Sequence, residues 1–147
     1  MCGSLRREET ANLIGKDPQP SGLYAQWKGK GHSFPIKLND GSSREAEFNG
    51  HARQEKLDGW LKAGWKEAEL HVAGYTEGRG ALYRQYEVPP THALKCVVRE
   101  VRSGKLVFNI VTRPAKGREK EIHDRFPVMV RRTGCTEQTC TKQTYPK

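Results

Sequence analysis

The strongest constraint on the fold is a pair of neighbouring segments in which apolar and polar side chains alternate. Residues 93–101 read ALKCVVREV, and residues 105–114 read KLVFNIVTRP after a turn at Ser103-Gly104. A period of two places successive side chains on opposite faces of a strand, and a short Gly-containing connection is typical of a hairpin. The sequence therefore predicts an antiparallel β-hairpin over residues 93–114.

Shorter strands and a few short helices make up the rest of the expected domain. An apolar stripe at Leu57, Trp60 and Leu61 indicates a helix after the strand-like start of the 45–65 segment. These patterns favour an α+β domain of several antiparallel strands. Other patterns predict a helix at 3–14, strands at 23–27, 69–78, 81–90 and 126–130, a helical turn within 115–125, a domain over 1–131 and a loose polar tail over 132–147.

The charge of the chain indicates a polyanionic partner. Its 147 residues suit one domain, and 26 Lys and Arg against 17 Asp and Glu leave a net charge of +9. Nucleic acid is the usual polyanion, because neutralised phosphates release counterions, although a basic surface can also serve solubility alone. The chain has no apolar run of about 18 residues and no apolar segment near its start, so we expect neither a membrane span nor a secretory signal.

The cysteines do not form a metal-binding pattern. Cys135 and Cys140 have no second Cys or His pair nearby, so we interpret them as incidental and expect no metal and no cofactor. Cys96 alternates with strand-like residues and is expected in the core. Without a secretory signal, we expect a reducing compartment and no disulfide framework.

The second residue is the sharpest local feature. Removal of Met1 would leave Cys2 with a free α-amine and a thiol on adjacent carbons. Both groups have reference pKa values of about 8, so both nucleophiles are present near neutral pH. Such an aminothiol condenses with an aldehyde to an imine, and its thiolate then closes a thiazolidine ring. The alternative is that the chain begins Met-Cys by chance.

Three other segments carry groups suited to chemistry. His123 lies between a charged segment and an apolar strand, where it can move protons or form an ordinary strand-edge contact. Glu77 ends a strand in a glycine-flanked turn and can act as a general acid or base if burial raises its pKa; otherwise it is an exposed turn residue. Asn49, His51 and Arg53 alternate, so in an extended strand they share one face, which suits a phosphate or a sugar hydroxyl or is merely a polar surface.

Four motifs occur in a fixed order along the chain. It begins MCGS, continues with HARQE at 51–55 and AGYTEG at 73–78, and has FNIVTRPA at 108–115 followed by IHDRFPV at 122–128. This set resembles the SOS response-associated peptidase (SRAP) family. That family begins Met-Cys-Gly-Arg, carries Asn-Ala-Arg-x-Glu and a strand ending Asp-Gly-Phe-Tyr-Glu-Trp, and has Ile-His-Asp-Arg-Met-Pro-Val after a strand like FxIVTxxA.

The resemblance implies an SRAP-like fold with a barrel-like core. It also implies that this chain is a short, divergent member of the family. It also implies binding of single-stranded DNA and a covalent thiazolidine crosslink between Cys2 and abasic sites, which shields the lesion. In this assignment Glu77 is the acid/base for imine formation and ring closure. His123 transfers a proton to the sugar hydroxyl during ring opening and helps to reverse the link.

The resemblance also implies a DNA-binding group made of Asn49, His51 and Arg53. Arg53 corresponds to the residue that holds the flanking phosphate, and His51 occupies the family's asparagine position. Asn49 can take that role if the chain bulges at Gly50. The chain departs from the family pattern elsewhere, since Ser4 replaces an arginine and Gly78 replaces a tryptophan.

Two other functions stay open at this point. One is a non-covalent single-stranded nucleic-acid-binding module on the same fold, which would bind in a salt-sensitive way without needing Cys2. The other is an N-terminal-cysteine amidohydrolase or self-processing peptidase. We expect a monomer without a membrane partner, located in the cytoplasm of a bacterium or phage-infected cell or with its nucleoid.

Overall fold

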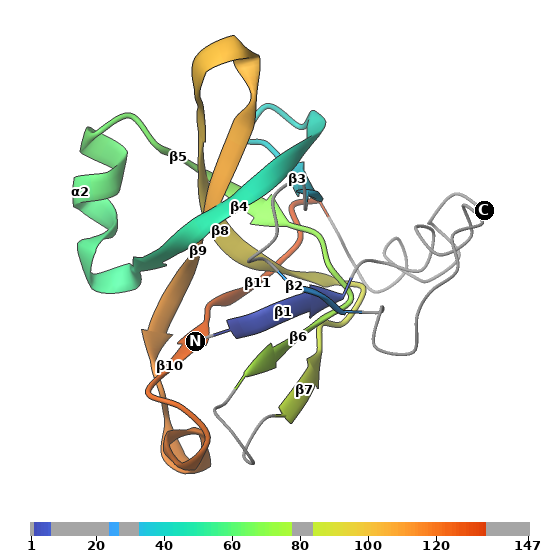
Figure 1. Ribbon diagram of the computed structural model, residues 1–147, viewed down its shortest axis with the longest axis vertical. Coiled ribbons are helices and arrows are strands. Elements are labelled where there is room, and N and C mark those ends of the chain that lie inside the picture. Colours follow the sequence, from blue (N-terminus) through green and yellow to red (C-terminus); the bar gives the residue numbers. More distant parts are fainter. Residues whose placement is uncertain (1, 7–23, 27–32, 78–83, 135–147) are drawn as a thin grey trace.

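Five strands of the described chain pair in a closed ring (Figure 1). The computed structural model describes residues 2–6, 24–26, 33–77 and 84–134, and only the main chain of residues 2–4 and 24–26. The ring strands are β3 (Ser33–Lys37), β4 (Ser43–Arg53), β5 (Lys66–Leu70), β8 (His92–Glu100) and β9 (Leu106–Pro114).

The ring closes in the order β9–β4–β3–β5–β8, with β8 pairing back to β9. Every pairing in it is antiparallel except that of β4 with β9, which is parallel. Two short strands, β10 (Arg125–Pro127) and β11 (Met129–Arg131), add to β9 and to β8 respectively. The expectation of mainly antiparallel strands around a barrel-like core agrees with this ring.

A second, antiparallel sheet has the order β2-β1-β6-β7. Its strands are β1 (Cys2–Arg6), β2 (Tyr24–Gln26), β6 (Gly74–Glu77) and β7 (Arg84–Glu87). Figure 1 shows β1 lying beside β6, so the start of the chain enters the fold as an inner strand.

Helical structure is short within the described part of the chain. It consists of one α-helix, α2 (Leu57–Lys62), and three 3₁₀ turns, η1 (Gln54–Lys56), η3 (Arg102–Gly104) and η4 (Gly117–Glu121). Two residues of the predicted apolar stripe, Leu57 and Trp60, pack against a small cluster of buried residues that includes Trp65 and Val111. The third, Leu61, is 38% exposed, so the stripe predicted the helix but not the burial of all three residues. No helix among these residues is long and apolar enough to cross a membrane.

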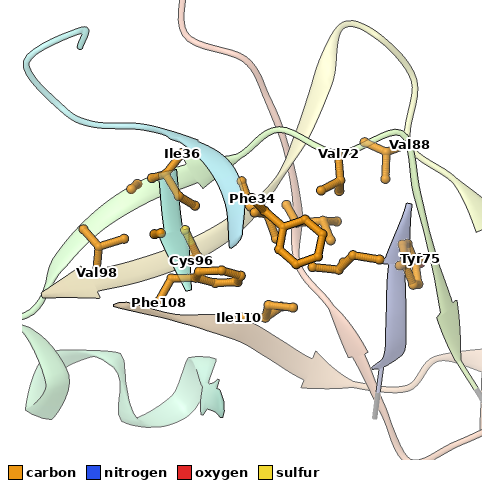
Figure 2. Packing of buried hydrophobic residues seen from close by; sticks show 14 of the residues in the cluster. Phe34, Ile36, Val72, Tyr75, Val88, Cys96, Val98, Phe108 and Ile110 are labelled. Atoms are coloured by element: carbon orange, nitrogen blue, oxygen red, sulfur yellow. The ribbon is translucent and has the colours of Figure 1, made fainter. Parts of the chain in front are cut away.

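The main core spans the ring and the second sheet (Figure 2). Phe34 and Phe108 are completely buried, and their rings meet edge to face with centroids 6.3 Å apart. Leu5 and Tyr75 bring β1 and β6 into the same cluster. The two sheets are therefore held together by shared apolar burial, the main favourable term in folding.

The structure confirms several sequence predictions. Strands β8 and β9 form the antiparallel hairpin, with Cys96 opposite Ile110, and Cys96 is completely buried. Burial raises the pKa of the Cys96 thiol far above its usual range, so this cysteine is a core residue. The predicted helix after the start of 45–65 is α2, and the helical turn within 115–125 is η4.

The predicted helix over 3–14 is wrong for its described part. Residues 3–6 lie in β1, and Leu5 is completely buried opposite Tyr75 of β6. Pairing with β2 and β6 on both edges satisfies the β1 main chain and outweighs a weak local preference for a helix. Residues 7–14 lie outside the described residues.

Two predicted single strands are each two strands. The 69–78 segment contains the end of β5 and all of β6, so the chain passes from the ring to the second sheet between them. The 126–130 segment divides at Val128, whose main-chain N–H bonds to Val111 at 2.9 Å and whose carbonyl accepts from Lys95 at 2.8 Å. Val128 thus bridges β9 and β8, and the strands on either side of it pair with different partners.

The predicted tail begins with anchored residues. Arg132 is buried and its Nε atom donates to the His92 carbonyl at 2.8 Å, while the Thr133 amide donates to Glu69 at 3.0 Å. The packed domain therefore continues at least to Thr133. Residues 135–147, including Cys135 and Cys140, lie outside the described residues.

Candidate functional site

The pairing of β1 with β6 places Cys2 directly opposite Glu77. Opposed residues of an antiparallel pair have Cα atoms about 4.5–5.5 Å apart. An irregularity between Cys2 and Ser4 shifts the register by one residue, and this shift is what brings Cys2 to Glu77. Cys2 and Glu77, which two separate sequence segments each suggested as catalytic residues, are thus neighbours across one pair of strands.

The Glu77 side chain is completely buried, and protein encloses both of its carboxylate oxygens. All four residues of β6 are buried, and the strand is paired with β1 on one edge and with β7 on the other. The exposed-turn alternative for Glu77 is therefore wrong.

His51 is half-buried near the end of β4, with its ring edge-on to Phe48 at a centroid distance of 5.4 Å. Burial lowers its pKa to about 4, and the positive charges of the amino terminus and of His123 lower it further. The ring is therefore neutral at neutral pH and offers one donor and one acceptor nitrogen. The effect of the His123 charge indicates that His123 lies near His51.

His123 follows η4 and is held by main-chain contacts on both sides. Its amide donates to the Glu119 carbonyl at 3.0 Å, and its Nδ1 atom accepts from the Arg125 amide at 3.3 Å. A nitrogen that accepts from an N–H carries no hydrogen itself, so in the neutral ring the hydrogen lies on Nε2. Nε2 is therefore the atom through which His123 can exchange a proton with a substrate.

The strand β4 bulges next to Gly50, as the hypothesis about Asn49 required. Phe48 pairs with Phe108 and Gly50 with Asn109, so Asn49 is the extra residue. Its Nδ2 atom donates to the Asn109 Oδ1 atom at 3.3 Å.

The bulge corrects the expectation that Asn49, His51 and Arg53 share one face. His51 and Arg53 pair with Ile110 and Thr112, which alternate with Asn109 along β9. Asn49 instead bonds to Asn109 and so belongs to the opposite face of the sheet. His51 and exposed Arg53 therefore remain together, and Asn49 is separated from them.

The sequence reasoning missed the partners of Arg125. Its guanidinium forms a two-pronged contact with Glu55, with both N–O distances 2.8 Å, and also donates to the carbonyl of Thr112 at 2.8 Å. The hydrogen bonds from Arg125 lower the pKa of Glu55 to about 2. Glu55 and Arg125 belong to two of the recognised motifs, and that membership was the only available signal, because nothing local predicts a contact across 70 positions.

Two of the surface hollows formed by described residues lie elsewhere, and none of the predicted site residues lines either one. A hollow of about 670 Å³ lies among the β3–β4 turn, the start of β5 and the β8–β9 hairpin, and one of about 280 Å³ adjoins it beside β11. They share Leu38, Asn39 and Glu67. Their linings mix opposite charges, such as Arg44 with Glu100, and they supply no second candidate as specific as Cys2 and Glu77.

In comparisons with known proteins, no family model, no curated protein and no solved structure matches this chain. The likeness to the SRAP family therefore rests on the sequence motifs, and the candidate site rests on its own geometry.

Proposed function

We propose that this protein binds single-stranded DNA and forms a thiazolidine crosslink with abasic sites through Cys2, after removal of Met1. The observation that carries the proposal is the direct pairing of Cys2 with Glu77 across β1 and β6. A nucleophile of this kind needs a proton donor and acceptor within reach, and the enclosed Glu77 carboxyl group is well placed for that role. The order of the four SRAP-like motifs supports the same assignment.

The proposed reaction needs no oxidant or reductant. The ring-opened deoxyribose of an abasic site presents an aldehyde carbon, to which the Cys2 α-amine adds. The carbonyl oxygen leaves as water, and an imine forms. The thiolate then attacks the imine carbon while the nitrogen takes up a proton. One aldehyde and one aminothiol thus give one thiazolidine and one water.

The neighbouring groups have distinct roles in this proposal. Glu77 donates a proton to the departing hydroxyl and then accepts the proton of the thiol. His123 exchanges a proton with the sugar hydroxyl through Nε2, and the neutral His51 ring provides hydrogen bonds beside it. The exposed guanidinium of Arg53 contacts a flanking phosphate.

A second candidate is a non-covalent nucleic-acid-binding module. The net charge of +9 favours it, since phosphate neutralisation alone can supply binding. It differs from the first candidate in one measurable way, because its binding depends on salt but on neither the lesion nor Cys2.

The deciding experiment is denaturing electrophoresis of the protein with single-stranded DNA that carries one abasic site. Intact-mass measurement first verifies that Met1 has been removed. The expected result is a denaturant-resistant species with the summed mass of protein and DNA less one water. It should be absent with Cys2→Ala, and absent with an oligonucleotide whose tetrahydrofuran abasic analogue has no aldehyde.

Cys96→Ala is the matched control, because it removes a thiol that is buried in the core. It should leave the crosslink unchanged. A crosslink that persists in Cys2→Ala would contradict the assignment of the nucleophile. Salt-sensitive binding without any crosslink, in protein lacking Met1, would favour the second candidate.

A further inference from the structure

The guanidinium of Arg125 is almost fully engaged within the protein. It makes four hydrogen bonds, two to the Glu55 carboxylate at 2.8 Å, one to the Thr112 carbonyl at 2.8 Å and one to the Thr112 hydroxyl at 3.3 Å. A guanidinium has five N–H donors, and the fork matches a carboxylate. The side chain of Arg125 is only 14% exposed, against 50% for Glu55.

These contacts join three segments of the candidate site. Glu55 lies in η1, directly after the end of β4, which carries His51. Thr112 lies in β9, opposite Arg53 of β4. Arg125 begins β10, two residues after His123. A single side chain thus connects the end of β4, the end of β9 and the turn that holds His123.

The hydrogen bond at His123 depends on this turn. The Arg125 amide donates to His123 Nδ1 at 3.3 Å, which is long for an N–H···N or N–H···O contact and therefore weak alone. It persists only if residues 123–125 keep their conformation, and the Arg125 side chain anchors the last of these residues on both Glu55 and Thr112. The η4 turn anchors the first, through the bond from the His123 amide to Glu119.

We propose that Arg125 and Glu55 form a positioning pair that holds His123 in place as its Nε2–H tautomer. The inference rests on the proposed function for the role of His123 in proton transfer, but the pair and the tautomer are properties of the free protein. Arg125 acts through His123 and is a positioning residue. Because four of its five N–H donors already bond to Glu55 and Thr112, Arg125 is less available to a phosphate than the exposed Arg53.

Two conservative variants test the pair. Glu55→Gln keeps the size of the side chain and removes its charge, and Arg125→Lys keeps the charge and removes the fork. Two-bond ¹H–¹⁵N spectra of the histidine rings report the tautomer in the DNA-free protein. We expect Nε2–H at His123 in the wild type and a mixture of tautomers in both variants.

The crosslinking rate provides the second readout. At saturating DNA we expect about a tenfold fall in rate in both variants, with unchanged DNA affinity, since a misplaced proton-transfer group affects the reaction rather than binding. Arg44→Lys and Glu100→Gln are the matched controls. They alter another Arg–Glu pair, on the hairpin side of the ring, and should change neither readout.

The outcomes separate the two proposals. An unchanged Nε2–H signal of His123 in Glu55→Gln overturns the positioning pair, whether or not the wild type crosslinks DNA. A wild type that forms no crosslink overturns the proposed function, and the ring spectra still decide the pair. If Arg125→Lys does not fold, Glu55→Gln decides alone, because the half-exposed Glu55 tolerates an amide.

Discussion

Two regions of the molecule place charged groups in opposite environments. In the hairpin region, Arg44 faces Glu100 at 3.7 Å and Lys105 faces Glu47 at 3.2 Å, and these side chains are 33–58% exposed. In the site region, the Glu77 carboxyl group is enclosed and the Arg125 guanidinium is covered. The same strand, β4, runs through both regions.

The difference indicates that the site region contains polar groups whose burial is energetically unfavourable, whereas the hairpin region does not. Exposed pairs contribute about 0–1 kcal/mol and need no special environment. Burying a carboxyl group or an imidazole is unfavourable unless other contacts offset it. Groups with such environments cluster at functional sites more often than elsewhere, which favours the Glu77 and His51 region over the larger hollow near the hairpin.

The largest expected effect is on the crosslinking rate, when Glu77 of the site region and Glu100 of the hairpin region are each replaced. Glu77→Gln should lower the rate of crosslinking to an abasic site about a hundredfold or more, because general acid–base catalysis typically contributes that much. Single-turnover kinetics on denaturing gels measure it. Glu100→Gln in the hairpin region should leave the rate unchanged. Equal rates in both variants would remove the distinction between the regions.

The next largest expected effect is the pH dependence that His51 gives to the stability of the fold. Its pKa is about 4 in the folded protein against 6.5 unfolded, so the unfolded chain binds more protons between these values. The stability of the fold should therefore fall as the pH drops from 6.5 to 4, by about 2–3 kcal/mol from this residue. Urea unfolding across this range measures it, and His51→Asn should flatten the slope. A slope unaffected by His51→Asn would show that the ring is not held neutral by burial.

Gly50 in the β4 bulge and Gly59 in α2 differ in the space that surrounds them. A Cβ at Gly50 would lie 2.9 Å from Oδ1 of buried Asn109, whereas a Cβ at Gly59 in α2 would meet nothing within 4 Å. Gly50→Ala should therefore destabilise the fold by about 1–3 kcal/mol. Gly59→Ala should stabilise it by about 0.5–1 kcal/mol, since alanine favours a helix. Thermal unfolding distinguishes them, and similar Tm shifts would contradict the bulge geometry.

The smallest effect belongs to the hairpin region. Lys105→Ala removes an exposed ion pair with Glu47 and should change the free energy of unfolding by less than about 1 kcal/mol. The change should shrink further at high salt, where exposed charges are screened. Chemical denaturation at low and high salt measures both effects. A loss above 2 kcal/mol would mean that the two regions do not differ as described.

The amino-acid sequence by itself determined the elements that depend on local periodicity. The alternation of 93–114 predicted the hairpin, the stripe at Leu57, Trp60 and Leu61 predicted α2, and the strand pattern around Cys96 predicted its burial. Each follows from which side chains recur on one face, which a short window of sequence is sufficient to show. The sequence also supplied the candidates Cys2, Glu77, His51 and His123 one motif at a time.

Only the tertiary structure decided how these elements meet. Residues 3–6 form a strand because they pair with β2 on one edge and with β6 on the other. The register of β1 on β6 brings Cys2 opposite Glu77. The bulge at Asn49 and the bond from Arg125 to Glu55 likewise depend on β4 lying parallel to β9. Long-range register follows from which strand edges and buried faces remain available once the core has formed, and no local pattern contains that information.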